Sequence, residues 1–301
     1  MVLYGSRGTP IRHIYKLMSE DIDFISRHKK RRSTGYFYRL NGNKMGYGWR
    51  PDLSVVDLNW AGVDREMAKA INSPESIVLS SSKFEARIKM QKDGVDVIPT
   101  WLYHEIPTDY EGVIIGRPFS HLGGQDFGVY NSIVEIPTEK IDGYYYSPFI
   151  AKVNEYRVHT TTLGVLDLKR KSPAEGVDVD LDEPQPWNLH TGNFRFHRIN
   201  PNYYSQKLVN VAIDAMVSMG HLFDAVDILE DAEGNFWVTE VNTSPGMKGS
   251  LYIQYADFFD EVVRRGGLPT EIEKRGYWRD IEHFEDANAR GARLRERFSW
   301  A

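Results

Sequence analysis

Two runs of alternating hydrophobic and polar residues, separated by a short polar turn, give the clearest structural signal in the chain. Residues 226–229 (Val-Asp-Ile-Leu) and 236–242 (Phe-Trp-Val-Thr-Glu-Val-Asn) flank the turn formers of residues 230–235 (Glu-Asp-Ala-Glu-Gly-Asn). This pattern predicts a β-hairpin. Because successive side chains of a strand point to opposite faces, Glu240 and Asn242 share one face, and Asp227 can meet them from the first strand.

The chemistry of this hairpin depends on the three oxygen-bearing side chains that it brings together. Two carboxylates and an amide suit Mg²⁺, which takes few protein ligands and completes its shell with water and phosphate. The alternative is a surface hairpin with ordinary solvated acids. The spacing alone does not separate these two interpretations.

The rest of the chain alternates between strand and helix patterns. Residues 2–4 predict a strand that enters a glycine loop lacking the dinucleotide and Walker spacings, and Ser73 with Pro74 marks a helix start. Residues 155–159 predict a strand with Glu155, Arg157 and His159 on one face. Further strands are predicted at 52–60, 95–99, 112–119 and 166–171, and further helices at 11–18, 82–91, 202–223 and 250–265.

These elements predict four successive regions. Residues 1–75 form a small N-terminal α/β domain, residues 76–150 a central lobe, and residues 151–265 a C-terminal lobe that carries the hairpin. Residues 266–301 are rich in charges of both signs, including Arg290 and Arg293, and predict a charged helix or tail.

Composition narrows the class of protein. With 301 residues the chain is long enough to bury a full core, and its net charge of −5 gives no overall basic field for nucleic acid. The absence of cysteine removes disulfides, thiolate metal sites and cysteine nucleophiles, which fits a reducing compartment. No apolar run is long enough to span a membrane, and the N-terminus lacks a signal-peptide core, so we expect a cytoplasmic protein.

One dense basic run stands apart from this balance of charge, at residues 27–32 (Arg-His-Lys-Lys-Arg-Arg). Such a run is usually a solvated face or a mobile loop. It could also guide an acidic protein tail or a nucleic acid toward the molecule.

The hairpin motif resembles the metal-binding strands of ATP-grasp enzymes, especially the ribosomal-protein glutamate ligase and carboxylate-amine ligase group. The residues concerned are 227–229 (Asp-Ile-Leu) and 240–246 (Glu-Val-Asn-Thr-Ser-Pro-Gly). The resemblance implies an α/β (α+β) ATP-grasp fold, in which two α+β lobes clasp ATP after a small α/β N-terminal domain. It also implies that Asp227, Glu240 and Asn242 hold two Mg²⁺ ions against the ATP phosphates, with Mn²⁺ able to substitute.

Other segments resemble the nucleotide-binding parts of the same group. The order of residues 72–75 (Asn-Ser-Pro-Glu) and 82–84 (Ser-Lys-Phe) places Lys83 at an ATP phosphate. Arg117 stands where the family usually has Lys, before a glycine loop in which Gly123 and Gly124 would cover the phosphates. Phe149 and Ile150 lie where the family hinges and reads adenine through backbone groups, although Pro148 replaces the usual Glu.

The reacting carboxylate has its own set of matches. Lys169 and Arg170 match a basic pair, with Lys169 assigned to the nucleotide and Arg170 to the acyl phosphate. Residues 187–193 (Trp-Asn-Leu-His-Thr-Gly-Asn) resemble the Asn-Leu-His-x-Gly segment, which assigns catalytic roles to Asn188 and His190 together with Arg157. A satisfied structural histidine is the alternative for His190.

The resemblance therefore implies an ATP-dependent carboxylate-amine ligase that works through an acyl phosphate. Its partners would be ATP, a carboxylate acceptor and an amine donor, which could be an amino acid, a peptide or a protein. No membrane or nucleic-acid partner is expected, and a homo-oligomer is left open. Two alternatives remain at this stage: an ATP-grasp kinase of a small alcohol, and a nucleotide-binding scaffold without turnover.

Overall fold

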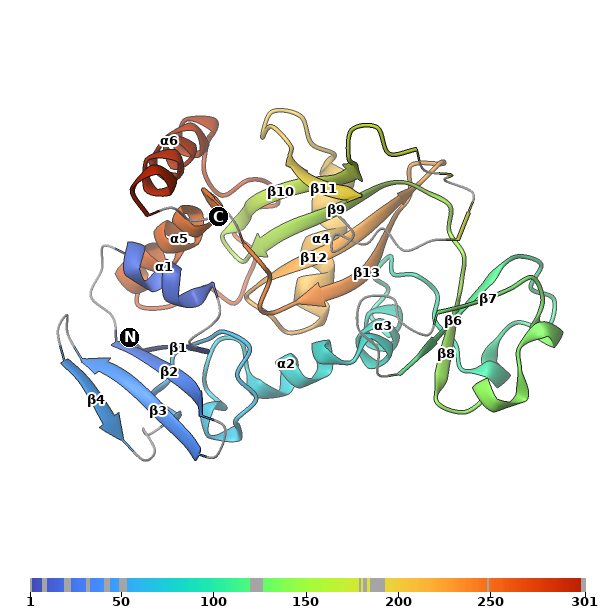
Figure 1. The fold of residues 1–301 in the computed structure, drawn as a ribbon, viewed down its shortest axis with the longest axis horizontal. Coiled ribbons are helices and arrows are strands. Elements are labelled where there is room, and N and C mark those ends of the chain that lie inside the picture. The colour runs from blue at the N-terminus through green and yellow to red at the C-terminus, as the bar shows by residue number, and fades with distance from the viewer. Residues whose placement is uncertain are drawn as a thin grey trace.

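Three β-sheets follow one another along the sequence, with helices between and around them (Figure 1). The computed structural model describes the chain except for residues 1, 7–9, 19–22, 31–32, 41–43, 49–52, 120–126, 179, 181–182, 185–192, 248 and 299–301. The N-terminal sheet and the central three-stranded sheet lie toward opposite ends of the long axis (Figure 1). Among the described helices, none is long and apolar enough to cross a membrane.

The N-terminal sheet has the order β4-β3-β2-β1-β5, with β1 parallel to both neighbours. Its strands are β1 (Val2–Ser6), β2 (Asp23–Lys30), β3 (Ser33–Leu40), β4 (Lys44–Gly48) and β5 (Leu58–Asn59). The strand predicted at 52–60 is only partly formed. A one-turn 3₁₀ helix, η1 (Leu53–Val55), comes first, because the Val56 N–H bonds back to the Leu53 carbonyl at 3.2 Å.

The basic run lies partly within this sheet. Residues 27–30 belong to β2, where all four pair with β3 and Arg27 also pairs with β1. Residues in a strand ladder are held by backbone hydrogen bonds, so these four are not the mobile loop that was one of the two ordinary interpretations. Residues 31–32 lie outside the described part of the chain.

Two short helices connect the N-terminal sheet to the central sheet. In α2 (Pro74–Ser81) the Ser73 hydroxyl accepts a hydrogen bond from the Ser76 N–H at 3.2 Å, which confirms the predicted cap. In α3 (Lys83–Lys92) Ser82 does the same for the Glu85 N–H at 3.3 Å. The remaining one-turn 3₁₀ helices are η2 (Arg65–Met67), η3 (Tyr103–Glu105), η4 (Ile133–Glu135) and η5 (Thr138–Lys140).

The central sheet is small and antiparallel, in the order β7-β6-β8. It consists of β6 (Ile114–Pro118), β7 (Gly128–Tyr130) and β8 (Tyr144–Pro148). The strand predicted at 95–99 does not join it. Instead, Val97 forms an isolated parallel bridge to Val238 of the C-terminal sheet, which ties the end of α3 to that sheet.

The C-terminal sheet is antiparallel throughout, in the order β11-β10-β9-β12-β13. Its strands are β9 (Lys152–Thr161), β10 (Gly164–Pro173), β11 (Phe194–Arg198), β12 (Phe223–Asp231) and β13 (Phe236–Asn242). The predicted hairpin is β12–β13. Its turn is closed by Asp231, which accepts from the Asn235 N–H at 2.7 Å, and by Gly234 at φ 76°.

Helices cover both faces of this sheet. On one face α4 (Gln206–Ser218) packs against Val158 and Val226, which are fully buried. On the other face α5 (Leu251–Arg265) approaches, and its Tyr255 hydroxyl hydrogen-bonds His159 Nδ1 at 3.0 Å. Two more helices, α1 (Ile11–Leu17) and α6 (Ile281–Phe298), pack on α5, and α6 lies within residues 266–301, where the sequence predicts a charged helix or tail.

Candidate active site

A row of charged residues runs across all five strands of the C-terminal sheet. The strand registers pair Arg198 with Lys169, Lys169 with Arg157, Arg157 with Asp227, and Asp227 with Glu240. Residues that are directly opposite in antiparallel strands point to the same face. The sheet therefore presents three cations and then two anions in order from β11 to β13.

Arg157 and Asp227 form a bidentate ion pair near the middle of this row. Arg157 Nε donates to Asp227 Oδ1 and Arg157 Nη2 to Asp227 Oδ2, both at 2.6 Å. Burial raises the pKa of Asp227 to about 6, against the lowering effect of Arg157. Burial by itself would lower the pKa of Arg157, but the Asp227 carboxylate outweighs it and the pKa is raised. At pH 7 the pair is therefore ionised.

Glu240 is held by a lysine from outside the sheet. Lys83, the first residue of α3, places its ammonium 2.6 Å from Glu240 Oε2. Burial alone would raise the pKa of Glu240, but Lys83 outweighs it, and the pKa falls to about 2. Asn242 Nδ2 donates to Glu240 Oε1 at 3.2 Å and approaches Asp227 Oδ2 at 3.4 Å. The three predicted metal ligands are thus brought together.

The donor set of these three residues fits magnesium in its chemistry. Asp227 and Glu240 supply carboxylate oxygens, and each oxygen has a further lone pair beyond its present hydrogen bond. Asn242 now turns its Nδ2 toward the carboxylates, so it would have to rotate its amide to offer Oδ1 to a cation. Among the described residues no group of three or more His, Asp or Glu side chains could hold a metal ion. The amide is therefore needed to complete the set.

A second cluster of charges, which the sequence predictions did not include, lies on the same face around Glu155. Its carboxylate accepts from Lys171 at 2.7 Å and from Lys152 at 3.0 Å. Burial would raise the pKa of Glu155, but the two lysines outweigh it and lower the pKa. Phe196 of β11 lies beside this cluster, with its ring 5.1 Å from the Arg157 guanidinium carbon and 5.9 Å from the Lys171 ammonium. Strand alternation from Lys169 could have identified Lys171.

Arg87 is another residue that the sequence predictions missed. It lies one helical turn after Lys83 on α3, and its Nε donates to the Thr239 carbonyl of β13 at 3.0 Å. Its Nη1 is buried without a hydrogen-bond partner among the described residues. The i, i+4 spacing of Lys83 and Arg87 was the available signal, because it places both cations on one helix face.

Arg117 of β6 brings a cation from the central sheet toward this group. Burial lowers its pKa, and the neighbouring Arg87 lowers it further, whereas Glu240 and Glu155 act in the opposite direction. Its guanidinium carbon lies 5.3 Å from the centre of the Phe127 ring. A half-buried guanidinium beside another cation is a place where an anionic group would be stabilised.

The remaining predicted residues are divided between this face and other places. Lys169 shares the face and lies 3.5 Å from Asp167 Oδ2, whereas Arg170 points to the opposite face in one row with Tyr156. The structure therefore does not bring Arg170 together with Asp227. Phe149 and Ile150 follow β8, where the Phe149 N–H bonds the Val113 carbonyl at 2.8 Å. Predicted residues outside the described part of the chain are Gly123, Gly124, Asn188 and His190.

Solved structures with the same arrangement identify the fold. VanG D-Ala:D-Ser ligase from Enterococcus faecalis has a TM-score of 0.57 at 14% identity, over 87% of this chain and 97% of that chain. D-alanyl-alanine synthetase A from Vibrio cholerae has a TM-score of 0.55 at 12% identity, over 88% and 96%. The ATP-grasp ligase PsnB with minimal precursor, Mg and ADP has a TM-score of 0.55 at 11% identity, over 88% and 96%.

The protein therefore has the ATP-grasp fold, as the hairpin motif implied. The match to another PsnB structure, the complex with minimal precursor, is shorter and spans 66% of this chain and 66% of that chain. No family profile matches the sequence, and no curated protein matches it.

Proposed function

We propose that this protein is an ATP-dependent carboxylate-amine ligase. The observation that carries the proposal is the cross-strand row in which Arg157, Asp227 and Glu240 face one another, with Lys83 held against Glu240. In an ATP-grasp fold this row supplies both oxygen donors for a cation and cations for phosphate. The solved ligases of the same fold support it, and the PsnB structure contains Mg and ADP.

The reaction has two balanced steps. An oxygen of the substrate carboxylate attacks the γ-phosphorus of ATP, the bond to the β–γ bridging oxygen breaks, and ADP leaves with that electron pair. The amine then attacks the acyl carbon, phosphate leaves with the electron pair of its C–O bond, and the amine nitrogen gives up a proton. Neither step needs covalent help from the protein, so positioning and charge stabilisation are what the site must provide.

Asp227, Glu240 and Asn242 would hold magnesium, with two ions as the expected number and Mn²⁺ as a substitute. Bound there, magnesium would neutralise charge on the phosphates and orient the reacting oxygens. A magnesium ion at this site would compete with Lys83 for Glu240, because both cations are attracted to the same carboxylate. Released from Glu240, the Lys83 ammonium becomes available to a phosphate.

The nucleotide phosphates would be held by cations from three elements, α3, β6 and β10. Lys83, Arg117 and Lys169 are the expected phosphate contacts, and the family resemblance adds the backbone of Gly123 and Gly124 to this role. The segment of Phe149 and Ile150 joins the central sheet to β9, which suits a backbone hinge that reads adenine.

Arg157 is the residue proposed for the acyl phosphate, together with Asn188 and His190. Its guanidinium is hydrogen-bonded to Asp227 and lies against the ring of Phe196. These contacts orient it before substrate binds. Arg170 is not included in this role, because it lies on the other face of the sheet. The carboxylate and amine would come from an amino acid, a peptide or a protein.

The deciding experiment is product formation by purified protein with ATP, Mg²⁺ and pooled amino acids and peptides, followed by mass spectrometry and phosphate release. The variant Glu240→Gln removes one proposed magnesium ligand and is expected to lower turnover at least about a hundredfold. Glu233→Gln, in the exposed turn of the same hairpin, is the matched control and should keep full turnover.

Two outcomes would contradict the ligase, and a third would contradict only the metal assignment. A phosphorylated alcohol as the stable product would indicate a kinase, and nucleotide binding without any turnover would indicate a scaffold. Full turnover in Glu240→Gln would reject the metal assignment.

A further inference from the structure

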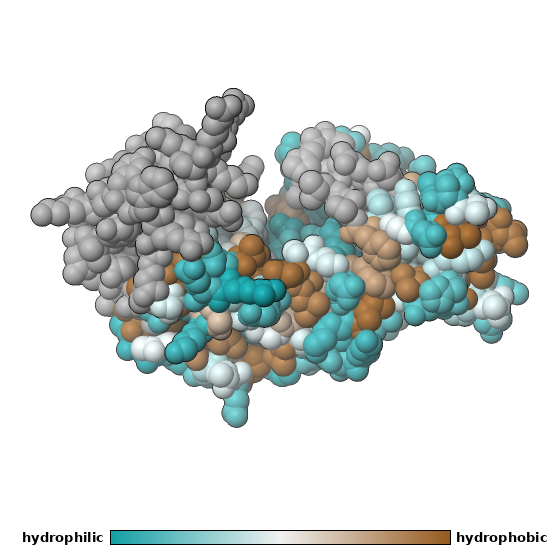
Figure 2. Space-filling view, turned by 90° about the horizontal axis from the view of Figure 1, so that it is seen from below, coloured by the Kyte–Doolittle hydropathy of each residue, from teal (hydrophilic) through white to brown (hydrophobic). Residues whose placement is uncertain are grey.

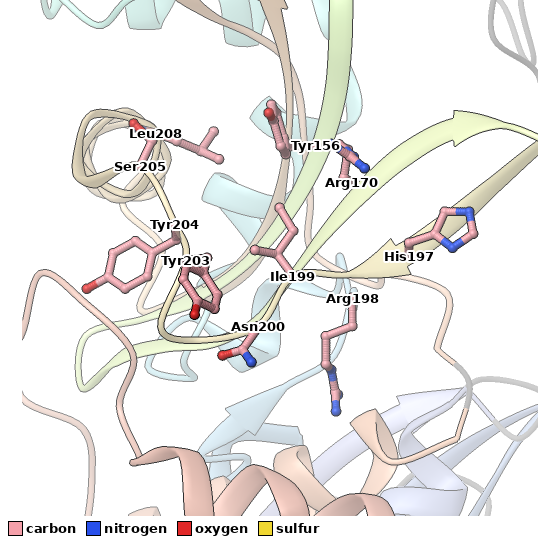
Figure 3. A pocket seen from close by; sticks show the side chains of 10 residues that line it. All are labelled: Tyr156, Arg170, His197, Arg198, Ile199, Asn200, Tyr203, Tyr204, Ser205 and Leu208. Carbon is pink, nitrogen blue, oxygen red and sulfur yellow. The ribbon is translucent and has the colours of Figure 1, made fainter.

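A cavity lies on the reverse face of the C-terminal sheet, beside the start of α4 (Figure 3). Its volume is about 560 Å³, within the range of roughly 300 to 1,000 Å³ that is usual for small-molecule sites. Figure 3 shows Arg170 next to Tyr156 on one side, with Tyr203 and Leu208 on the other. The cavity is lined by Tyr156, Arg170, His197, Arg198, Ile199, Asn200, Tyr203, Tyr204, Ser205 and Leu208.

The cavity lies on the opposite face of the sheet from Arg157 and Asp227, and Arg198 is the one residue of the charged row among its lining residues. Tyr156, Arg170 and His197 are opposite one another in β9, β10 and β11, so they form one row on a single face. Arg157 and Lys169 are their chain neighbours and therefore point to the other face. A ligand in the cavity cannot reach the reacting atoms through the sheet.

The pairing of Arg170 differs from that of its two cationic neighbours. Lys169 lies 3.5 Å from Asp167 and Lys171 lies 2.7 Å from Glu155, whereas Arg170 makes no hydrogen bond or ion pair with any described residue. Glu230 is hydrogen-bonded to Tyr156, the residue opposite Arg170. Its carboxylate accepts from the Tyr156 hydroxyl and from Asn154 Nδ2, both at 2.7 Å. Arg170 is therefore an exposed guanidinium at the cavity, with no hydrogen-bond or ion-pair partner in the part of the chain that the structure describes.

The opposite wall of the cavity is aromatic and apolar. Tyr203 is 77% exposed, which is high for so large a ring, and the partly buried Ile199 adds aliphatic surface beside it, whereas Leu208 is only 2% exposed. The first turn of α4 contains no acidic residue that would repel an anion. A flat ring could pack between these side chains while an anionic group pairs with Arg170.

Figure 2 shows another face of the molecule, on which hydrophilic and hydrophobic residues are interspersed.

We propose that this cavity binds a small aromatic carboxylate, with the carboxylate on Arg170 and the ring between Tyr156 and Tyr203. The site does not depend on the ligase function, because it uses none of the residues assigned to magnesium, nucleotide or acyl phosphate.

The test uses ligand-observed saturation-transfer NMR on the full chain with three probes: phenylacetate, 4-hydroxyphenylacetate and indole-3-acetate, each beside its amide. We expect each acid to bind at least fivefold more tightly than its amide. Arg170→Met keeps the length of the side chain but removes its charge, and it should abolish this preference while leaving amide binding unchanged. Arg195→Met, on the same strand face as His197 but outside the lining, is the matched control.

A second variant keeps the proposal testable if the Arg170→Met protein does not fold. Tyr203→Ala changes an exposed side chain and should weaken the acids and the amides equally, by at least threefold. The proposal is overturned if none of the acids binds, if Arg170→Met retains the preference for acid, or if ATP with Mg²⁺ displaces the probes. Displacement would place the probes in the active site and not on the reverse face.

Discussion

Arg157 of β9 and Asp227 of β12 lie opposite each other and are joined by two hydrogen bonds of 2.6 Å, at a position where both side chains are mostly buried. The pair connects the proposed acyl-phosphate residue to the proposed magnesium ligand. Any change to one of them therefore acts on the other, in stability as well as in chemistry.

The stability of this pair can be tested with a double-mutant cycle. Arg157→Ala leaves Asp227 buried without its partner and should lower the free energy of unfolding by about 3 to 5 kcal/mol. Adding Asp227→Asn to Arg157→Ala should recover part of that loss, because the uncompensated charge is removed. Urea titrations of the wild type, both single variants and the double variant measure the coupling. Additive effects would show that the two side chains do not interact.

Lys83 is expected to compete with metal for Glu240. Lys83→Met should raise the Mn²⁺ affinity of the nucleotide-free protein several-fold, because a positive charge 2.6 Å from the carboxylate is removed. The same variant should lower ATP affinity through loss of a phosphate contact. Mn²⁺ titration followed by electron paramagnetic resonance gives the first value and calorimetry the second. Lys92→Met, at the far end of α3, is the control, and weaker Mn²⁺ binding in Lys83→Met would contradict the competition.

His159 should make the fold sensitive to acid. Burial, followed by the nearby Lys169 and Arg157, lowers the pKa of its imidazole well below the usual value. Below about pH 6.5, His159 therefore binds a proton in the unfolded chain but stays neutral in the folded protein. The free energy of unfolding should fall by up to about 1.4 kcal/mol per pH unit from this group as pH decreases. The loss begins near the unfolded pKa and ends at the folded pKa.

The matched variant for this effect is His159→Asn, whose amide can replace Nδ1 at the Tyr255 hydroxyl but does not titrate. Denaturant titrations between pH 5 and 7.5 should give a smaller pH slope for the variant than for the wild type. Equal slopes would mean that His159 is protonated to the same extent in both states.

The basic residues of β2 give a prediction about salt. If residues 27–32 guide an acidic acceptor, replacing Arg27, Lys29, Lys30 and Arg31 with Gln should raise the apparent KM mainly at low ionic strength. At physiological salt, screening largely removes such guidance at distances beyond about 8 Å. KM should therefore be compared at low and at high NaCl. The same salt profile in the wild type and the variant would identify the run as an ordinary solvated part of the sheet.

The sequence by itself determined the features that depend on local alternation and on short motifs. The β12–β13 hairpin, the Ser73 cap and the shared face of Glu240 and Asn242 follow from residues close in the chain, and all three are present. Alternation also separates Lys169 from Arg170, because neighbouring residues of a strand point to opposite faces. A motif match that assigned both to one site overlooked this constraint.

Only the tertiary structure decided which distant charges meet. Lys83 reaches Glu240, and Arg87 reaches the Thr239 carbonyl, because α3 packs against β13, and no local pattern encodes that packing. The cavity at Arg170 likewise requires β10, β11 and the start of α4 to come together. The physical reason is the same in each case: spacing along the chain fixes the direction of a side chain, but its partner is fixed by how separate elements pack.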